Sequence, residues 1–191
     1  MTTLRAFLAG FVGEDCRFCA NSCDDIPGLC NRCLANLEWN ITCCFYCGIP
    51  ISSGSTCLAC ASAPPPLMGT VSPLVYADQT AQLIQWFKYD RQLALASTLS
   101  ALMRRRPPTF LTSKTVLLPV PSCPTRFRGR GFNPAAELAV CLADSVGVNC
   151  ELSVVQRCRG AVPQSSLKRE AERHSNIRGA FKVQGLSLIH I

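Results

Sequence analysis

Cysteines are the residues of this chain whose number and spacing point most directly to chemistry. The chain has 191 residues and 14 Cys, and ten of the cysteines lie between Cys16 and Cys60. Eight of these ten form four pairs with two residues between the partners: Cys16 and Cys19, Cys30 and Cys33, Cys44 and Cys47, Cys57 and Cys60. The last two pairs repeat the first two after 27 or 28 residues. The segment is therefore an internal duplication of a four-cysteine unit.

This spacing predicts two structural zinc ions, held by those eight cysteines and grouped sequentially along the chain. A pair with two intervening residues places two thiolates on one side of a tight backbone knuckle. Two facing knuckles then give the tetrahedral, all-thiolate shell that zinc prefers, with no position open for water. Gly28 and Gly48 lie where the backbone must curl around the sulfur atoms. One intact site beside a decayed one, an iron–sulfur cluster and disulfides are the alternatives.

Two further cysteines of this region are left without a partner at that spacing. Cys43 sits beside Cys44 and could replace it as a ligand, but only Cys44 keeps the two-residue spacing to Cys47. Cys23 has no such neighbour. We therefore exclude both from the predicted ligand set.

Arginines form the second group suited to chemistry, in the segment 122–133. They alternate with glycine and phenylalanine, and guanidinium groups match phosphate oxygens while a phenylalanine can stack on a base. A helix is expected from Pro134 to about Val146, capped by Asn133, and a helix N-terminus also suits phosphate. A solvated surface loop is the alternative, and Cys123 is interpreted as a bystander because no histidine lies near it. The predicted phosphate- or nucleic-acid-binding residues are Arg126, Arg128, Arg130, Gly131 and Asn133.

Composition and charge bound the class of protein. Hydrophobic residues make up 48% and charged residues 16%, which excludes disorder for most of the chain. No run approaches the roughly 20 apolar residues of a membrane-spanning helix. The formal net charge is +7, divided into −2 over residues 1–63 and +9 over residues 64–191. A slightly acidic, cysteine-rich module therefore precedes a basic one, which favours phosphate-bearing partners.

The first 15 residues predict a short amphipathic helix that packs on its own protein. Leu4, Phe7, Leu8 and Phe11 recur at helical spacing, and acidic residues follow at once. The stretch is too short for a secretory signal, so we expect a cytoplasmic, reducing compartment in which 14 cysteines are not a disulfide framework. Secretion is the alternative.

The remaining elements alternate between strand and helix, which predicts an α/β domain. A proline-rich boundary comes first, at 61–66. Helices are expected over 77–106, as two pieces broken near Tyr89 and Asp90, and over 134–146. A polar helix or arm is expected over 165–175. The run from Arg104 to Arg106 is expected to end the second helix on a solvated face. Strands are expected at 71–76, 115–121, 152–155 and 180–183.

Several of these motifs, in this order, resemble the ComF family of bacterial proteins linked to competence and DNA uptake. The resemblance covers residues 16–183, and Pro134 departs from it because the family usually has Gln there. The matching motifs are the four cysteine pairs, Ile84 with Lys88 and Tyr89, Pro119-Val-Pro121, Arg130-Gly-Phe-Asn133 with Glu137-Leu-Ala139, Arg157 with Arg159, Pro163-Gln164, Leu167, Arg173, Asn176 and Gly179-Ala-Phe181.

The resemblance implies an α/β fold class. A small double zinc ribbon (16–61) and a Pro-rich linker (62–72) precede an incomplete phosphoribosyltransferase-like domain with a Rossmann-type parallel sheet (73–185). Arg157, Gln164 and Arg173 would belong to a flexible substrate hood. The family's ligand loop, two adjacent Asp before Thr-Thr-Gly, should follow Val183 and does not. Residues 186–191 match a translated sequencing adaptor, so we expect a truncated chain.

Three functions follow from the resemblance. The first is an accessory protein of DNA uptake that binds single-stranded DNA and a partner such as a helicase-like translocation protein. The second is an enzyme acting on phosphoribosyl pyrophosphate with Mg2+, for which the present chain is expected to be inactive because the ligand loop is missing. The third is a zinc-ribbon interaction module on a decayed enzyme scaffold, because a fold does not by itself supply an activity.

Overall fold

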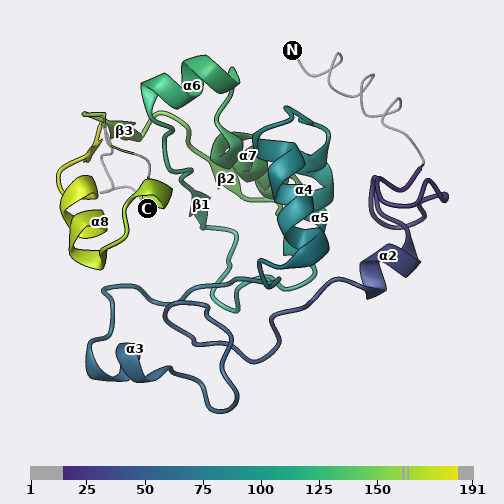
Figure 1. Cartoon of the computed structure of the whole chain (residues 1–191), viewed down its shortest axis with the longest axis horizontal. Helices are drawn as coiled ribbons and strands as arrows, with labels where there is room; N and C mark the ends of the chain where they lie inside the picture. The colour runs from purple at the N-terminus through teal and green to yellow at the C-terminus, as the bar shows by residue number, and fades with distance from the viewer. Residues whose placement is uncertain (1–14, 161, 163, 185–191) are drawn as a thin grey trace. The chain divides into compact units, whose positions relative to one another are not determined.

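The structure, a computed structural model, describes residues 15–160, 162 and 164–184 (Figure 1). The chain forms two compact units that divide between Leu111 and Thr112. The helix expected at the N-terminus, apart from its last residue, and the adaptor-like segment 186–191 lie outside the described residues.

The cysteine-rich part of the first unit is a structural repeat. Helices α2 (Asn31–Ala35) and α3 (Leu58–Ser62) each begin directly after a cysteine, Cys30 or Cys57. The two cap residues have nearly the same backbone angles, φ −75° and ψ 161° against φ −76° and ψ 160°. The internal duplication that the cysteine spacing indicates is therefore also present in the backbone conformation.

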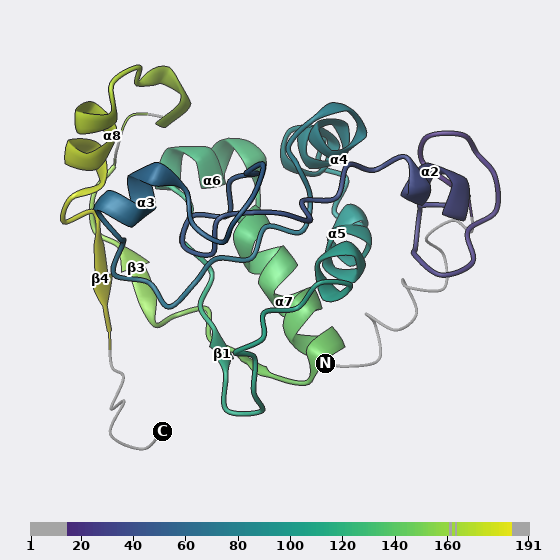
Figure 2. The ribbon, with the colours of Figure 1, turned by 90° about the horizontal axis from the view of Figure 1, so that it is seen from below.

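Two longer helices complete the first unit, α4 (Asp78–Lys88) and α5 (Leu95–Arg104). They are the two pieces predicted over 77–106, and they lie side by side in Figure 2. Their apolar stripes are buried: Leu83 and Phe87 on α4, and Leu95, Leu99 and Leu102 on α5. The broken-helix prediction is confirmed.

The first ribbon packs on these helices. The hydroxyl of Thr98, which is buried on α5, donates a hydrogen bond to the carbonyl of Pro27 at 2.5 Å. The rings of Phe18 and Trp86 lie 5.3 Å apart between centroids. The compact units therefore group α4 and α5 with the cysteine-rich half, whereas the boundaries inferred from sequence place these helices in the basic domain.

The arginine run at the end of α5 reaches into the rest of the unit. The Arg106 guanidinium donates to the carbonyl of Asn40 at 2.9 Å and to that of Ile41 at 3.4 Å. The buried Asn40 amide in turn donates to the carbonyl of Gly48 at 2.7 Å and to that of Ser72 at 3.0 Å. Arg106 is therefore a structural contact of the second ribbon, and not only a solvated helix end.

The second unit contains a small parallel sheet. Strand β1 (Val116–Leu117) pairs with β2 (Asn149–Cys150) in the register Val116 to Asn149. Helices α6 (Pro124–Arg130) and α7 (Pro134–Val146) connect the two strands, and α7 packs against β2. A strand, a helical crossover and a parallel strand follow one another, as the α/β prediction requires.

A second strand pair holds the remaining helix. Strand β3 (Val155–Arg157) runs antiparallel to β4 (Phe181–Val183). The chain between them forms the 3-10 turn η1 (Gln164–Ser166) and helix α8 (Glu170–Ile177). The described sheets have two strands each, so a complete phosphoribosyltransferase-like sheet stays a prediction.

Several local expectations differ from the structure. The strand expected at 152–155 is replaced by β2, which ends at Cys150, and β3, which begins at Val155. The arginine segment is expected as a loop but forms α6, because Pro124 pre-sets the first turn and Gly131, at φ 85°, ends the helix in the left-handed conformation. The buried strand expected at 115–121 shortens to the half-exposed β1 before Pro119. The strand expected at 71–76 reduces to an isolated bridge between Leu74 and Trp39.

Replacing Arg106 with Ala should lower the free energy of unfolding of the first unit by about 1 to 2 kcal/mol. The change removes two charge-assisted hydrogen bonds and leaves the partly covered carbonyl of Asn40 without its donor. Urea unfolding followed by tryptophan fluorescence measures the effect, and Arg104→Ala, at an exposed position of the same helix end, is the matched control. Equal urea midpoints for the two variants would show that the hydrogen bonds of Arg106 do not stabilise the unit.

Candidate metal centres and the arginine helix

Each four-cysteine unit gathers its sulfur atoms into one cluster. In each cluster all four Sγ atoms lie within 4.8 Å of one another. The distances given for single pairs are 3.5 Å for Cys19–Cys30, 3.6 Å for Cys19–Cys33 and 3.8 Å for Cys47–Cys57. Zn–S bonds of about 2.3 Å in a tetrahedron place sulfurs about 3.8 Å apart, so both clusters could hold a zinc ion.

The clusters group sequentially, as the duplicated spacing predicts, and Cys23 and Cys43 belong to neither. The first cluster consists of Cys16, Cys19, Cys30 and Cys33, and the second of Cys44, Cys47, Cys57 and Cys60. In each cluster the sulfur donors come from one knuckle and from the cap residue and first turn of one short helix.

The knuckles have the same hydrogen bonds in both ribbons. The N–H of Ala20 donates to the carbonyl of Cys16 at 2.8 Å, and the N–H of Gly48 donates to that of Cys44 at 2.8 Å. Both donors follow the pair directly and have positive φ angles, 57° at Ala20 and 71° at Gly48. The first ribbon therefore places a residue with a Cβ where the second has the glycine that this conformation favours.

Without metal, the thiols of each cluster differ in pKa, so some ionise readily and others do not. Burial raises the pKa of Cys16, but the N–H groups of Cys30 and Phe18 lower it more, so that it falls from 9.0 to about 6. The N–H of Cys57 contributes most to lowering the pKa of Cys44 to about 6. Burial and neighbouring thiols raise the pKa of Cys60 to about 12.

The same causes raise the pKa of Cys33 in the first cluster. Each cluster thus holds one thiolate that backbone amides stabilise and at least one thiol that resists ionising beside it. A bound divalent cation would make these thiols ionise more readily, because it neutralises the negative charge of the neighbouring thiolates.

The predicted arginines lie on and beside α6. Arg126 and Arg128 are exposed, whereas Arg130 is half-buried. Residues four apart share a helix face, so Arg126 and Arg130 lie on one side and Arg128 on another. Phe127, between them, is 50% exposed. The helix therefore brings the three guanidiniums into one segment without aligning them on one face.

Asn133 occupies the cap of α7, as predicted. Its side-chain oxygen accepts from the N–H of Ala135 at 3.2 Å and from the Ser122 hydroxyl at 2.8 Å. Its amide donates to the carbonyl of Val120 at 3.1 Å. These contacts fix the chain before and after α6, so Asn133 holds the arginine helix between its two neighbouring segments.

The residues predicted for the substrate hood lie at the end of β3 and in the segment between β3 and β4. The guanidinium of Arg157 lies over the ring of Phe181 at 5.1 Å. Gln164 donates to the carbonyl of Arg173 at 3.2 Å, and Arg173 donates to that of Leu167 at 3.0 Å. All three side chains have contacts within this segment.

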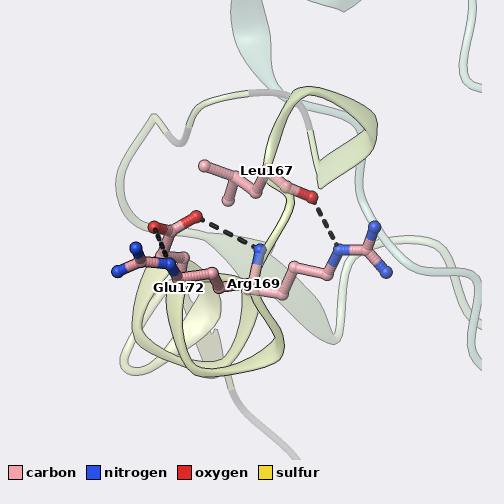
Figure 3. A network of polar contacts seen from close by, with 4 residues as sticks. Leu167, Arg169 and Glu172 are labelled. Atoms are coloured by element: carbon pink, nitrogen blue, oxygen red, sulfur yellow. Dashed lines mark hydrogen bonds and ion pairs between the residues drawn. The ribbon is translucent and has the colours of Figure 1, made fainter.

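The segment also has a hollow and a helix cap. The carboxylate of Glu172 accepts from the N–H of Arg169 at 3.3 Å. Figure 3 shows this contact beside the one that Arg173 makes with the Leu167 carbonyl. An open hollow of about 590 Å3 borders α8. Its lining residues are Gln164, Lys168, Glu170, Arg173, His174 and Ile177. Lys168 and His174, which the sequence interpretation did not single out, thus join Gln164 and Arg173.

Relatives of known name match most of the chain. It is 28% identical over 172 residues to the DNA utilization protein YhgH of Salmonella typhimurium, covering 85% of this chain and 75% of that protein. The protein of the same name from Escherichia coli is 29% identical over 163 residues, with 82% and 71% covered. That from Shigella flexneri gives the same values. The chain is therefore similar to DNA utilization proteins over most of its length.

Two other comparisons give no match. No family model matches the chain, and no solved structure matches it at a significant level. Within the described residues, the structure has no helix with the length and apolar character needed to cross a bilayer.

Zinc binding should weaken steeply as the pH falls. At pH 7 the low pKa values of Cys16 and Cys44 leave one thiolate ready in each cluster, so each zinc ion should displace about three protons. Affinity should therefore be highest above pH 8 and fall progressively toward pH 6. Competition with a chromophoric chelator across this range gives the affinity, and elemental analysis should give two zinc ions per chain. Affinity that does not change with pH would contradict the thiolate count.

The left-handed residue after each knuckle predicts opposite effects in the two ribbons. Ala20→Gly should stabilise the metal-loaded first unit by about 0.5 to 1 kcal/mol, because it removes left-handed strain from a residue with a Cβ. Gly48→Ala should destabilise it, since the new Cβ would also lie 3.1 Å from Cγ2 of Thr70 and 3.2 Å from Cβ of Ser72. Thermal unfolding at fixed excess zinc compares the pair. Shifts of the same sign in both variants would refute the assignment.

Proposed function

We propose that this chain is a ComF-like accessory protein of DNA uptake, which binds single-stranded DNA and is organised by two structural zinc ions. The similarity to DNA utilization proteins over 85% of the chain carries this proposal. The zinc ions would have a structural role, because each cluster offers four thiolates and no open ligand position.

The arginine helix α6 is the part of the second unit best suited to a nucleic-acid strand. From residue 112 onward the sequence has eleven Lys and Arg against five Asp and Glu, so the unit attracts phosphate. Arg126 and Arg128 are exposed on α6, and Phe127 offers half of its surface to a base. Unstacked bases of a single strand can stack on such a ring, whereas bases within a duplex cannot.

The zinc ribbons would supply the contact with other proteins of DNA uptake, such as a helicase-like translocation protein. Their charges support this division of labour. The ribbon segment as far as residue 63 carries a net charge of −2, so it has less attraction for phosphate than the rest of the chain.

Replacing Arg126, Arg128 and Arg130 together with Ala should abolish binding to an oligothymidine strand near physiological salt. For the unaltered protein the logarithm of affinity should fall linearly with that of salt, by about 0.7 for each phosphate contact in a single strand. Because two of the arginines share one face of α6, the variant should lose at least about 1.4 of this slope. Fluorescence anisotropy over a salt series measures both quantities.

The control variant for this experiment is Arg32→Ala, Arg104→Ala and Lys114→Ala in one chain. It also loses three positive charges, but from exposed positions outside α6. Its affinity should fall only modestly through the change in net charge. Equal losses in the two triple variants would mean that general charge, and not α6, binds the strand.

A second candidate is an enzyme of the phosphoribosyltransferase type that acts on phosphoribosyl pyrophosphate with a divalent cation. The parallel pairing of β1 with β2 across a helical crossover favours it, because nucleotide-binding α/β sheets are built from this unit. Release of pyrophosphate that disappears with EDTA would support the enzyme, whereas strand binding that depends on the arginines of α6 would support the accessory role.

A further inference from the structure

The two ribbons share a backbone but present different surfaces. Three positions of the second ribbon carry large apolar side chains where their counterparts in the first ribbon are polar and exposed. The pairs are Phe45 for Arg17, Ile49 for Asn21 and Leu58 for Asn31. Phe45 is 46% exposed, Ile49 48% and Leu58 89%. Duplication alone would give the two surfaces the same character.

The interiors of the two ribbons also differ, and here the first ribbon is the more apolar one. The first ribbon buries Ile26, Leu29 and Leu34, each no more than 8% exposed. Counting along the repeat, their counterparts in the second ribbon are Ser53, Thr56 and Ala61. Between residues 41 and 79, all of them described, the buried hydrophobic side chains are only those of two cysteines. The second ribbon thus carries its large apolar residues on the outside.

The segment after the second ribbon extends this apolar surface. The N–H of Thr70 donates to the carbonyl of Phe45 at 2.8 Å. Gly69 lies so close to the Phe45 ring that a Cβ on it would be 2.9 Å from the ring. The neighbouring Leu67 and Met68 are 57% and 73% exposed. We call the exposed apolar side chains of this ribbon and the segment after it the ribbon-2 patch: Phe45, Ile49, Leu58, Leu67 and Met68.

The patch lies in a stretch without charge. No Asp, Glu, Lys, Arg or His occurs between Glu38 and Asp78, although the chain as a whole carries a net charge of +7. Nucleic acid is an unsuitable occupant, because it binds through basic side chains. An apolar exposed surface of this kind marks a protein interface.

We propose that the ribbon-2 patch is the contact between two copies of this chain. Across a twofold axis a surface faces its own copy. The basic surfaces of this chain would then repel one another, whereas an uncharged patch can face itself without repulsion. The five exposures amount to about three full side chains, on the order of 500 Å2 per copy. Two copies that covered all of this surface would bury about 1,000 Å2, which is the lower limit for a specific interface.

The first ribbon supplies the test, because it shows which residues this backbone accepts at the patch. The variant Phe45→Arg, Ile49→Asn, Leu58→Asn places first-ribbon residues on the second ribbon. Sedimentation velocity of the zinc-loaded chain over about a hundredfold range of concentration should show a concentration-dependent dimer. The graft should be a monomer that keeps two zinc ions by elemental analysis.

The controls remove exposed apolar side chains elsewhere. Leu152 and Val183 of the second unit are 54% and 65% exposed, so Leu152→Asn with Val183→Asn should leave the dimer intact. If the three-residue graft loses zinc, the single change Leu58→Asp tests the contact instead, at a position that is 89% exposed. It should shift the dimer dissociation constant by at least about tenfold, because an unpaired charge would be buried at the contact.

Two results would overturn the proposal. One is an unaltered protein that stays monomeric over the whole range, which would assign the patch to a different protein. The other is a dimer that survives both the graft and Leu58→Asp. Neither result bears on strand binding by α6, because the arginine variants leave the patch unchanged.

Discussion

Four thiolates held around one point are the constraint on which the cysteine-rich half of the chain depends. The ribbons are short, and the second buries no large apolar side chain between residues 41 and 79. A segment with so little interior cannot offset its own conformational entropy by burial. Its folding free energy has to come from metal binding, and the backbone amides that point at Cys16 and Cys44 prepare each cluster for it.

Helix α5 connects this metal-dependent half to an ordinary hydrophobic interior. One ribbon bonds to Thr98 within the helix, and the other bonds to Arg106 just beyond its end. The buried Asn40 carries the second connection onward to the knuckle at Gly48. Both ribbons are therefore positioned by a helix that follows them in the sequence.

Local features of the sequence predicted the local structure well. The cysteine spacing predicted both clusters, the break near Tyr89 predicted two helices, and Asn133 with Pro134 predicted the start of α7. These features depend on neighbours within a few residues. The sequence did not predict α6, because its glycines and arginines resemble a loop until Pro124 and Gly131 are read as the two ends of a helix. Nor did it predict that α4 and α5 pack with the ribbons, because contacts such as Thr98 with Pro27 join residues 71 positions apart.

The opposite interiors of the two ribbons have a consequence for local stability. The first ribbon buries Ile26, Leu29 and Leu34, so it should keep part of its packing when a chelator removes its metal, whereas the second should then retain only its hydrogen bonds. The second ribbon should behave as a separate foldon, whose amide hydrogens exchange with solvent well before those of the first. A half-loaded chain would then be a discrete species, folded through its first ribbon and open at its second.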